Sequence, residues 1–128
     1  MTTIREIMQP DPITVGPESL IKDALEILIE NRISGLPVVD PNDAIVGILS
    51  EKDLLKAFYE PRAVTVDAIM TREPIMFATN AALVDVVDCL MANDFRRVLI
   101  HEDGRLVGLI SRADLMPAIL AAIGDATH

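Results

Sequence analysis

Two short segments of the sequence repeat polar residue types that could bind a ligand. In each segment a glycine is followed three residues later by a serine and three residues after that by an aspartate: Gly47, Ser50 and Asp53, then Gly108, Ser111 and Asp114. An aspartate carboxylate has two acceptor oxygens, which suit the adjacent 2′- and 3′-hydroxyls of a ribose. A serine at a helix N-terminus suits a phosphate, and the glycine would allow a ligand to approach closely. The same spacing also fits a helix capping box, so a binding role and a structural role both stay open.

These two segments belong to a longer internal repeat. Ile7-Met8 recurs as Ile69-Met70, and Pro12-Ile13 as Pro74-Ile75, both 62 positions later (69 − 7; 74 − 12). The Gly-x-x-Ser-x-x-Asp segments recur after 61 positions (108 − 47). Because polar and apolar positions keep one register, the chain is a tandem duplication. We expect the first copy at residues 1–62, the second at 63–124 and a tail at 125–128.

Each copy is predicted to run strand, helix, strand, strand, helix, after an amphipathic lead-in at residues 3–8 or 65–70. We expect first strands at 13–15 and 75–77, hairpins at 36–49 and 98–110, and closing helices that start at Ser50 and Ser111. Ser19 and Asn80 are predicted N-caps of the first helices. Asn31 and Asn93 are expected to end them in left-handed conformation. The predicted class is α/β (α+β), and two copies this small are expected to pack on each other.

Composition and charge narrow the function. Of the 128 residues 51% are hydrophobic, and 20 acidic residues outnumber 11 basic ones for a net charge of −9. This predicts a globular chain that binds neither nucleic acid nor an anionic membrane. The longest uncharged stretch, residues 74–84, is too short to span a bilayer, and the start lacks the features of a secretory signal. Cys89 is the only cysteine and is predicted to be a buried, inert thiol. We therefore expect a cytoplasmic protein.

A family resemblance rests on ordered segments taken together: residues 7–8, 12–15, 34–40, 46–53 and 106–114. Over residues 4 to 120 the chain resembles a tandem pair of cystathionine-β-synthase (CBS) domains, a regulatory module. The resemblance implies a pseudo-twofold pair with two clefts between the copies. It further implies an adenosine-containing ligand (AMP, ADP, ATP or S-adenosylmethionine) and no catalytic cofactor.

The resemblance also implies which residues contact the ligand. Asp53 and Asp114 would hold ribose, and Ser50 and Ser111 would lie near phosphate. The implied contacts in the first copy are Ile13, Thr14, Gly35, Leu36, Pro37, Ser50 and Asp53. Those in the second are Ile75, Met76, Arg96, Arg97, Val98, Ser111 and Asp114. Met76 and Leu99 depart from the family pattern, in which Thr and Pro are common at these positions.

The two implied sites are unequal. Arg96 and Arg97 stand where kinase-regulating γ subunits of the family carry a basic pair that grips phosphates, whereas the first copy has Ser34 and Gly35 there. Without the resemblance the two arginines read as solvated surface residues. Arg112 is a third candidate phosphate ligand, with surface solvation as its alternative.

The sequence leaves three classes of function to compare. The first is a regulatory module that senses an adenosine ligand and acts on a target protein in trans. The second is a structural or oligomerisation module with degenerate, empty clefts. The third, an enzyme, is disfavoured because the sequence offers no nucleophile–base pair, metal cluster or P-loop; His101, expected at a strand edge, has no clustered His or Cys with which to bind a metal. The apolar run at residues 118–123 predicts a homodimer, in agreement with the resemblance.

Overall fold

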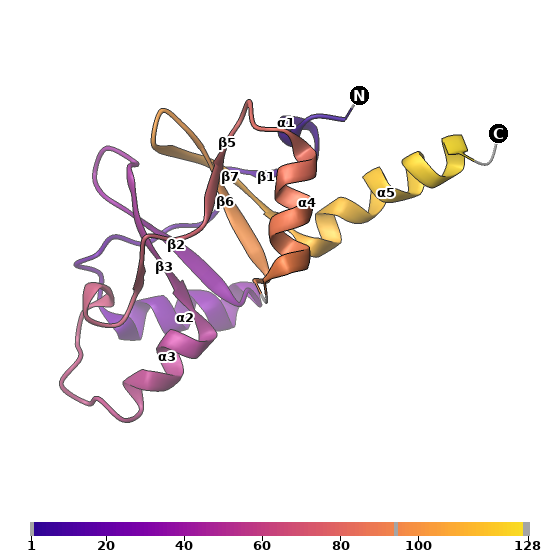
Figure 1. The fold of residues 1–128 in the computed structure, drawn as a ribbon. Coiled ribbons are helices and arrows are strands. Elements are labelled where there is room, and N and C mark those ends of the chain that lie inside the picture. The colour runs from indigo at the N-terminus through magenta and orange to yellow at the C-terminus, as the bar shows by residue number, and fades with distance from the viewer. Residues whose placement is uncertain (1, 94, 127–128) are drawn as a thin grey trace. The chain divides into compact units, whose positions relative to one another are not determined.

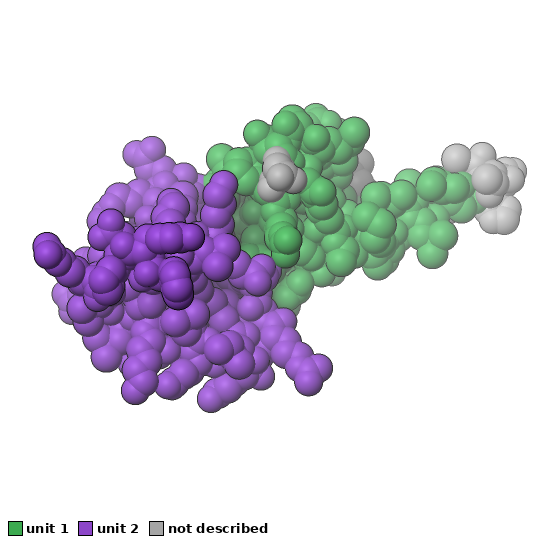
Figure 2. Space-filling view, turned by 90° about the horizontal axis from the view of Figure 1, so that it is seen from below, with its two compact units in different colours: residues 1–12, 75–128 green, residues 13–74 purple. Residues whose placement is uncertain are grey.

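The computed structural model describes residues 2–93 and 95–126, which divide into two compact units (Figures 1 and 2). Unit 1 comprises Met1–Pro12 and Ile75–His128, and unit 2 comprises Ile13–Pro74. Each unit therefore contains the strands and helices of one copy together with the first twelve residues of the other, 1–12 or 63–74. These longer segments, which include the predicted lead-ins, are called lead-in segments below. The predicted fold class, mixed helix and strand in two repeats, is confirmed.

Unit 2 is built on a three-stranded antiparallel sheet in the order β2-β3-β4. Its elements are α2 (Ile21–Asn31), β2 (Gly35–Val39), β3 (Ile45–Ser50), α3 (Glu51–Ala57), the 3-10 helix η1 (Val66–Ala68) and β4 (Thr71–Arg72). Leu36, Val38 and Leu49 have no exposed surface and pack with residues of α2 and with Val66 in one aliphatic core. The segment before α2 joins the sheet at one parallel bridge, Val15 with Val38.

Unit 1 is built on a four-stranded sheet in the order β1-β7-β6-β5, in which only the β5–β6 pair is parallel. Its elements are α1 (Ile4–Ile7), β1 (Gln9–Pro10), β5 (Met76–Ala78), α4 (Leu83–Ala92), β6 (Arg97–Glu102), β7 (Arg105–Ser111) and α5 (Arg112–Ala126). Val98, Ile100 and Ile110 have no exposed surface and form the core with Val86 of α4 and Ile4 of α1. Among the described residues, no helix is long and apolar enough to cross a membrane.

Two glycines let the lead-in segments lie against the hairpins. A Cβ atom on Gly47 would come within 2.8 Å of both the Met70 sulfur and the Thr71 carbonyl oxygen. On Gly108 it would lie 2.6 Å from the Met8 sulfur and 2.9 Å from the Gln9 carbonyl oxygen. The expectation that these glycines make room for a ligand is therefore wrong, because the chain itself fills the space above each of them.

Both hairpins are confirmed, but the predicted ends of the first helices are wrong. The N-cap residues of α2 and α4 are Leu20 and Ala82, and neither makes a side-chain capping bond. The Ser19 hydroxyl instead accepts a hydrogen bond from the Gly16 N–H within the preceding turn. Asn80 lies in a turn upstream of α4.

The C-terminal ends of these helices also differ from the prediction. The left-handed residue after α2 is Arg32, with φ of 53°, and not Asn31. Asn93 at the end of α4 has an extended backbone. Each asparagine amide donates to a carbonyl one helical turn earlier, Ile27 and Cys89 respectively. Both asparagine side chains thus cap the last turn, in addition to the left-handed Arg32 after α2 and without a left-handed residue after α4.

Candidate ligand-binding site

Each of the two candidate residue sets falls inside one compact unit. The set of the first copy, from Ile13 to Asp53, lies in unit 2, and the set of the second copy, from Ile75 to Asp114, lies in unit 1. In both units the hairpin ends at the serine, and a helix begins at the next residue. The strand and the helix together therefore fix the serine and aspartate of each set.

In unit 2 the carboxylate of Asp53 is buried, with 3% of the residue exposed. Its Oδ2 accepts hydrogen bonds from the Ser50 N–H and the Ser50 hydroxyl, both at 2.9 Å. The Asp53 N–H in turn donates to the Ser50 hydroxyl oxygen at 3.2 Å, which completes a capping box. The hydroxyl of Thr71, from β4, lies 3.1 and 3.2 Å from the two carboxylate oxygens. The Lys56 ammonium is 3.8 Å from Oδ1.

In unit 1 the arrangement recurs around Asp114, which is only half-buried. Its Oδ2 accepts hydrogen bonds from the Ser111 N–H at 2.7 Å and the Ser111 hydroxyl at 3.0 Å. The third donor to the carboxylate in unit 2, the Thr71 hydroxyl, is replaced here by the side-chain amide of Gln9, from β1, at 3.1 and 2.9 Å from Oδ1 and Oδ2.

Gln9 and Thr71 are members of the site that the sequence reasoning missed. They occupy equivalent positions in the repeat, 62 residues apart (71 − 9). The signal that could have found them is their place directly after the repeated Ile-Met pair. Their side chains differ, so these positions do not stand out as a repeated residue type in the sequence.

The pairing of β6 with β7 places an arginine beside the serine of unit 1. Arg97 is opposite Ser111 in the antiparallel register, whereas in unit 2 Gly35 is opposite Ser50. Directly opposed residues project from the same face of a sheet with Cβ atoms about 5 Å apart. The Arg97 side chain therefore starts next to the Ser111–Asp114 pair, and unit 2 has no side chain at the matching position. Arg96, the residue before it, is exposed.

The apolar candidates divide by exposure. Leu36, Pro37 and Val98 are fully buried, so only their backbone is available to a ligand without rearrangement. Ile13, Ile75 and Met76 are exposed by 44%, 41% and 39%, respectively. Backbone hydrogen bonds tie these exposed segments to the hairpins, from Val15 N–H to the Pro37 carbonyl and from Leu99 N–H to the Ile75 carbonyl. Thr14 lies between Ile13 and Val15 and is half-buried.

The other polar residues considered as ligands, Arg112 and His101, make hydrogen bonds within the chain. The Arg112 guanidinium donates to the carbonyls of Leu90 and Asn93 at the end of α4, so it satisfies carbonyls that a helix end leaves open. His101 on β6 accepts from the Gly104 N–H through Nδ1. Cys89 is half-buried, less than predicted. Within residues 2–93 and 95–126, no group of three or more His, Cys, Asp or Glu side chains could hold a metal ion.

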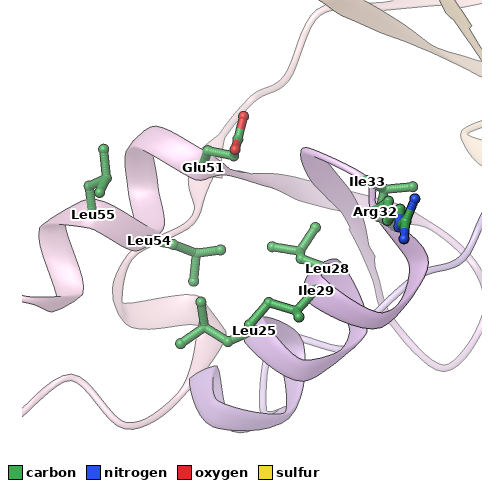
Figure 3. Close-up of a pocket in the computed structure, with 8 residues that line it drawn as sticks. All are labelled: Leu25, Leu28, Ile29, Arg32, Ile33, Glu51, Leu54 and Leu55. Atoms are coloured by element: carbon green, nitrogen blue, oxygen red, sulfur yellow. The ribbon is translucent and has the colours of Figure 1, made fainter.

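A separate apolar groove of about 430 Å³ runs between α2 and α3 (Figure 3). Its lining is Leu25, Leu28, Ile29, Arg32, Ile33, Glu51, Leu54 and Leu55. None of these is a candidate ligand contact. Aliphatic side chains form most of the wall, and Ile29 and Leu55 are largely exposed.

Comparisons with known proteins agree with this architecture. The family model of the CBS domain matches residues 4–60 and 66–121. The chain is 29% identical over 115 residues to the protein MJ1225 of Methanocaldococcus jannaschii, covering 88% of this chain and 41% of that protein. It spans no more than 64% of the length of four further curated relatives.

Two solved structures are similar over nearly the whole chain. The structure of CBSX2 in complex with AMP, a protein of Arabidopsis thaliana, has a TM-score of 0.86 and 30% identity, and the match covers 95% of this chain and 98% of that one. The CBS domain pair of MJ0100, in complex with 5′-methylthioadenosine and S-adenosyl-L-methionine, has a TM-score of 0.82 and 28% identity, with the same coverage. With two successive matches to the family model that together span most of its residues, the chain belongs to the CBS domain family, as a tandem pair.

Proposed function

We propose that this chain is a regulatory module that binds an adenosine-containing ligand and signals through a change of conformation or assembly. The observation that carries the proposal is the similarity to two CBS pairs whose structures contain AMP, or methylthioadenosine and S-adenosylmethionine. These ligands share an adenine base and a ribose. The proposal assigns no catalytic step to the chain.

The roles within each site follow from the chemistry of the side chains. Asp53 and Asp114 are the proposed acceptors for the ribose hydroxyls, because a carboxylate can accept from two adjacent hydroxyls at once. Exposed Ile13 and half-buried Thr14 in one unit, and exposed Ile75 and Met76 in the other, are the proposed contacts of the base. Gly35, Leu36, Pro37 and Val98 would contribute backbone only, since the side chains of the last three are buried.

Unit 1 is the proposed phosphate-binding site. A chain of net charge −9 repels a polyanion unless positive charge is concentrated near it. Arg97 on β6 lies opposite Ser111 on β7, and Arg96 is the residue before Arg97. Charge-assisted hydrogen bonds from arginine to phosphate are strong and often bidentate. Discrimination among AMP, ADP and ATP, and so any sensing of energy state, would depend on this pair.

The second candidate, a structural or oligomerisation module, is favoured by one observation. Both aspartate carboxylates already accept several hydrogen bonds from the chain itself. The Ser-x-x-Asp segments would then serve only to cap α3 and α5. This candidate predicts that no adenosine ligand binds.

Titration calorimetry with AMP, ATP and S-adenosylmethionine separates the two candidates. We expect Asp114→Ala to weaken binding by roughly 10- to 150-fold, the effect of removing charge-assisted hydrogen bonds, and Asp53→Ala to weaken a second binding event. The variants Asp53→Asn and Asp114→Asn keep the side-chain shape if the alanine variants are unstable. Asp88→Ala, which removes an exposed carboxylate of α4, is the matched control and should leave binding unchanged.

The same titration tests the phosphate assignment. The double variant Arg96→Ala, Arg97→Ala should weaken AMP binding and spare adenosine. Equal losses for both ligands would contradict the role of the arginines. No heat with any of the nucleotides, or unchanged affinity in both aspartate variants, would contradict the binding module itself.

We also propose that the chain forms a homodimer through α5 and that its output reaches a target protein in trans. On α5, Ile119, Leu120 and Ile123 are exposed by 40%, 72% and 58%. Removing such aliphatic surface from water favours association by about 25 cal/mol per Å². A second copy of the chain is the proposed cover for these residues.

A further inference from the structure

Both candidate aspartates accept hydrogen bonds from a residue of the lead-in segment that lies outside the Ser-x-x-Asp motif. Thr71 on β4 contacts Asp53, and Gln9 on β1 contacts Asp114. Each donor group lies within 3.2 Å of both oxygens of its aspartate. A ligand that uses either carboxylate must therefore reach it past this donor.

Neither aspartate carboxylate has enough free acceptor sites for two ribose hydroxyls. A carboxylate has about four lone-pair sites on its two oxygens. In both units the serine N–H and hydroxyl use Oδ2. The remaining oxygen, Oδ1, has Thr71 or Gln9 as its donor at 3.1 Å. Two adjacent ribose hydroxyls need acceptor sites on the side where this donor now lies.

We propose that Gln9 and Thr71 are positioning residues that stand in for the ligand at the two carboxylates, so that ligand binding is an exchange. In this exchange the ribose hydroxyls displace the lead-in side chain from Asp114 or Asp53, and the serine bonds stay in place. The inference rests on the proposed function and adds to it the step that controls affinity.

The exchange also couples the ligand to the lead-in strand. Only Gln9 and Pro10 of β1 pair with β7, and Pro10 has no N–H to donate. The Gln9–Asp114 contact is a side-chain attachment of β1, in addition to its backbone pairing with β7 and the hydrogen bond from the Asp11 N–H to the Val107 carbonyl at 3.4 Å. Arg5 of the preceding α1 forms an ion pair with Glu102 at 2.8 Å. Displacing Gln9 loosens β1, which gives ligand binding a route to a conformational signal.

The free-energy cost of releasing the aspartate carboxylate should differ between the two sites. Asp53 is 3% exposed, whereas Asp114 is half-buried. Gln9 is exposed and has a long side chain, which regains rotamer freedom when it is released, while the shorter Thr71 regains less. We therefore expect the Asp114 site of unit 1 to fill first.

The first test follows the Gln9 amide directly. Gln9 is the only glutamine in the sequence, so isotope labelling of glutamine side-chain nitrogen yields a single nitrogen signal, coupled to the two amide protons, in a nuclear magnetic resonance spectrum. Addition of AMP to saturation should move this signal to the position of a solvated amide. A signal that stays unchanged while calorimetry shows AMP bound would overturn the exchange.

The second test measures affinity. Gln9→Ala, and Gln9→Met as a variant that keeps the side-chain length, should tighten AMP binding roughly three- to tenfold, the range of one net hydrogen bond. Thr71→Val should do the same for the second binding event. Asp88→Ala is the control, because it removes an exposed carboxylate of α4 and leaves Gln9 on Asp114; its dissociation constant for AMP should equal that of the wild type.

The outcomes separate this inference from the proposed function. If the wild type binds AMP but neither Gln9 variant binds it more tightly, the exchange is wrong and the binding module stands. If AMP binds only after Gln9 is replaced, Gln9 blocks the wild-type site and does not exchange with the ligand, so both the exchange and the binding module are wrong. If neither the wild type nor any variant binds AMP, the binding module is wrong and the exchange with it.

Discussion

Replacing Gly108 with alanine should push the N-terminal lead-in away from unit 1. The new Cβ would lie 2.6 Å from the Met8 sulfur and 2.9 Å from the Gln9 carbonyl oxygen. The methionine side chain can turn aside, but the carbonyl belongs to β1, so the strand itself has to shift. Overpacking of this kind costs about 1–3 kcal/mol. Alanine recovers about 0.4–1 kcal/mol by restricting the unfolded chain, so we expect a net loss in the free energy of unfolding between about 0 and about 2.6 kcal/mol.

The chain contains two matched controls for this substitution. Gly124 lies in α5, and a Cβ there has no atom within 4 Å, so Gly124→Ala should raise stability by up to about 1 kcal/mol through helix propensity. Gly16→Ala would make only ordinary contacts, at 3.7 and 3.9 Å, and should be neutral or slightly stabilising. The three variants make the same chemical change and differ in what surrounds the added methyl group.

Urea unfolding followed by circular dichroism measures the three free energies. Adding Met8→Ala to Gly108→Ala should restore only part of the loss, because the Gln9 carbonyl remains in place. The reasoning is refuted if Gly108→Ala is as stable as Gly124→Ala, or if Met8→Ala removes the whole loss. The first result would mean that no close approach exists, and the second that the sulfur alone causes the strain.

Two further predictions concern the helices. Ser50→Ala should lower the free energy of unfolding by about 1 kcal/mol, because the Asp53 N–H and carboxylate both lose their hydrogen bond with the serine hydroxyl. Ser50→Thr should keep most of the stability in the same urea titration. An unchanged urea midpoint for Ser50→Ala would contradict the capping role of Ser50. Leu120→Glu should convert the proposed dimer to a monomer, as measured by light scattering. Val84→Glu, which introduces the same charge at an exposed aliphatic residue of α4, should leave the dimer intact. A wild type that is already monomeric would rule out the dimer.

The features that sequence predicted well are those that neighbouring residues determine. The two hairpins follow from apolar runs separated by a turn with Asp43 or Asp103 and Gly104, and these residues do adopt positive φ angles. The start of α3 follows from Ser50 and Asp53, which form their capping box within one turn. Local hydrogen bonds fix each of these features, so the tertiary fold has little influence on them.

The features that sequence missed depend on distant residues. Ser19 is a good helix cap in isolation, but the chain places its hydroxyl against the Gly16 N–H and starts α2 at Ile21. Backbone bonds across the unit then hold this region, from Ile21 N–H to the Val64 carbonyl and from Val66 N–H to the Ser19 carbonyl. A pattern read within one copy cannot show such a contact.

The assignment of the repeated residues to folding or binding also changes with the structure. Gly47 and Gly108 recur because a methionine sulfur and a carbonyl oxygen of the opposite lead-in lie against them, and this is a packing role. Asp53 and Asp114 recur with a donor from the same lead-in on their carboxylates. The donor differs between copies, as threonine or glutamine, and so does the residue opposite the serine, Gly35 or Arg97. Where glycine, methionine, serine and aspartate are all kept by the duplication, these two varying positions are the ones able to make the two proposed binding sites unequal.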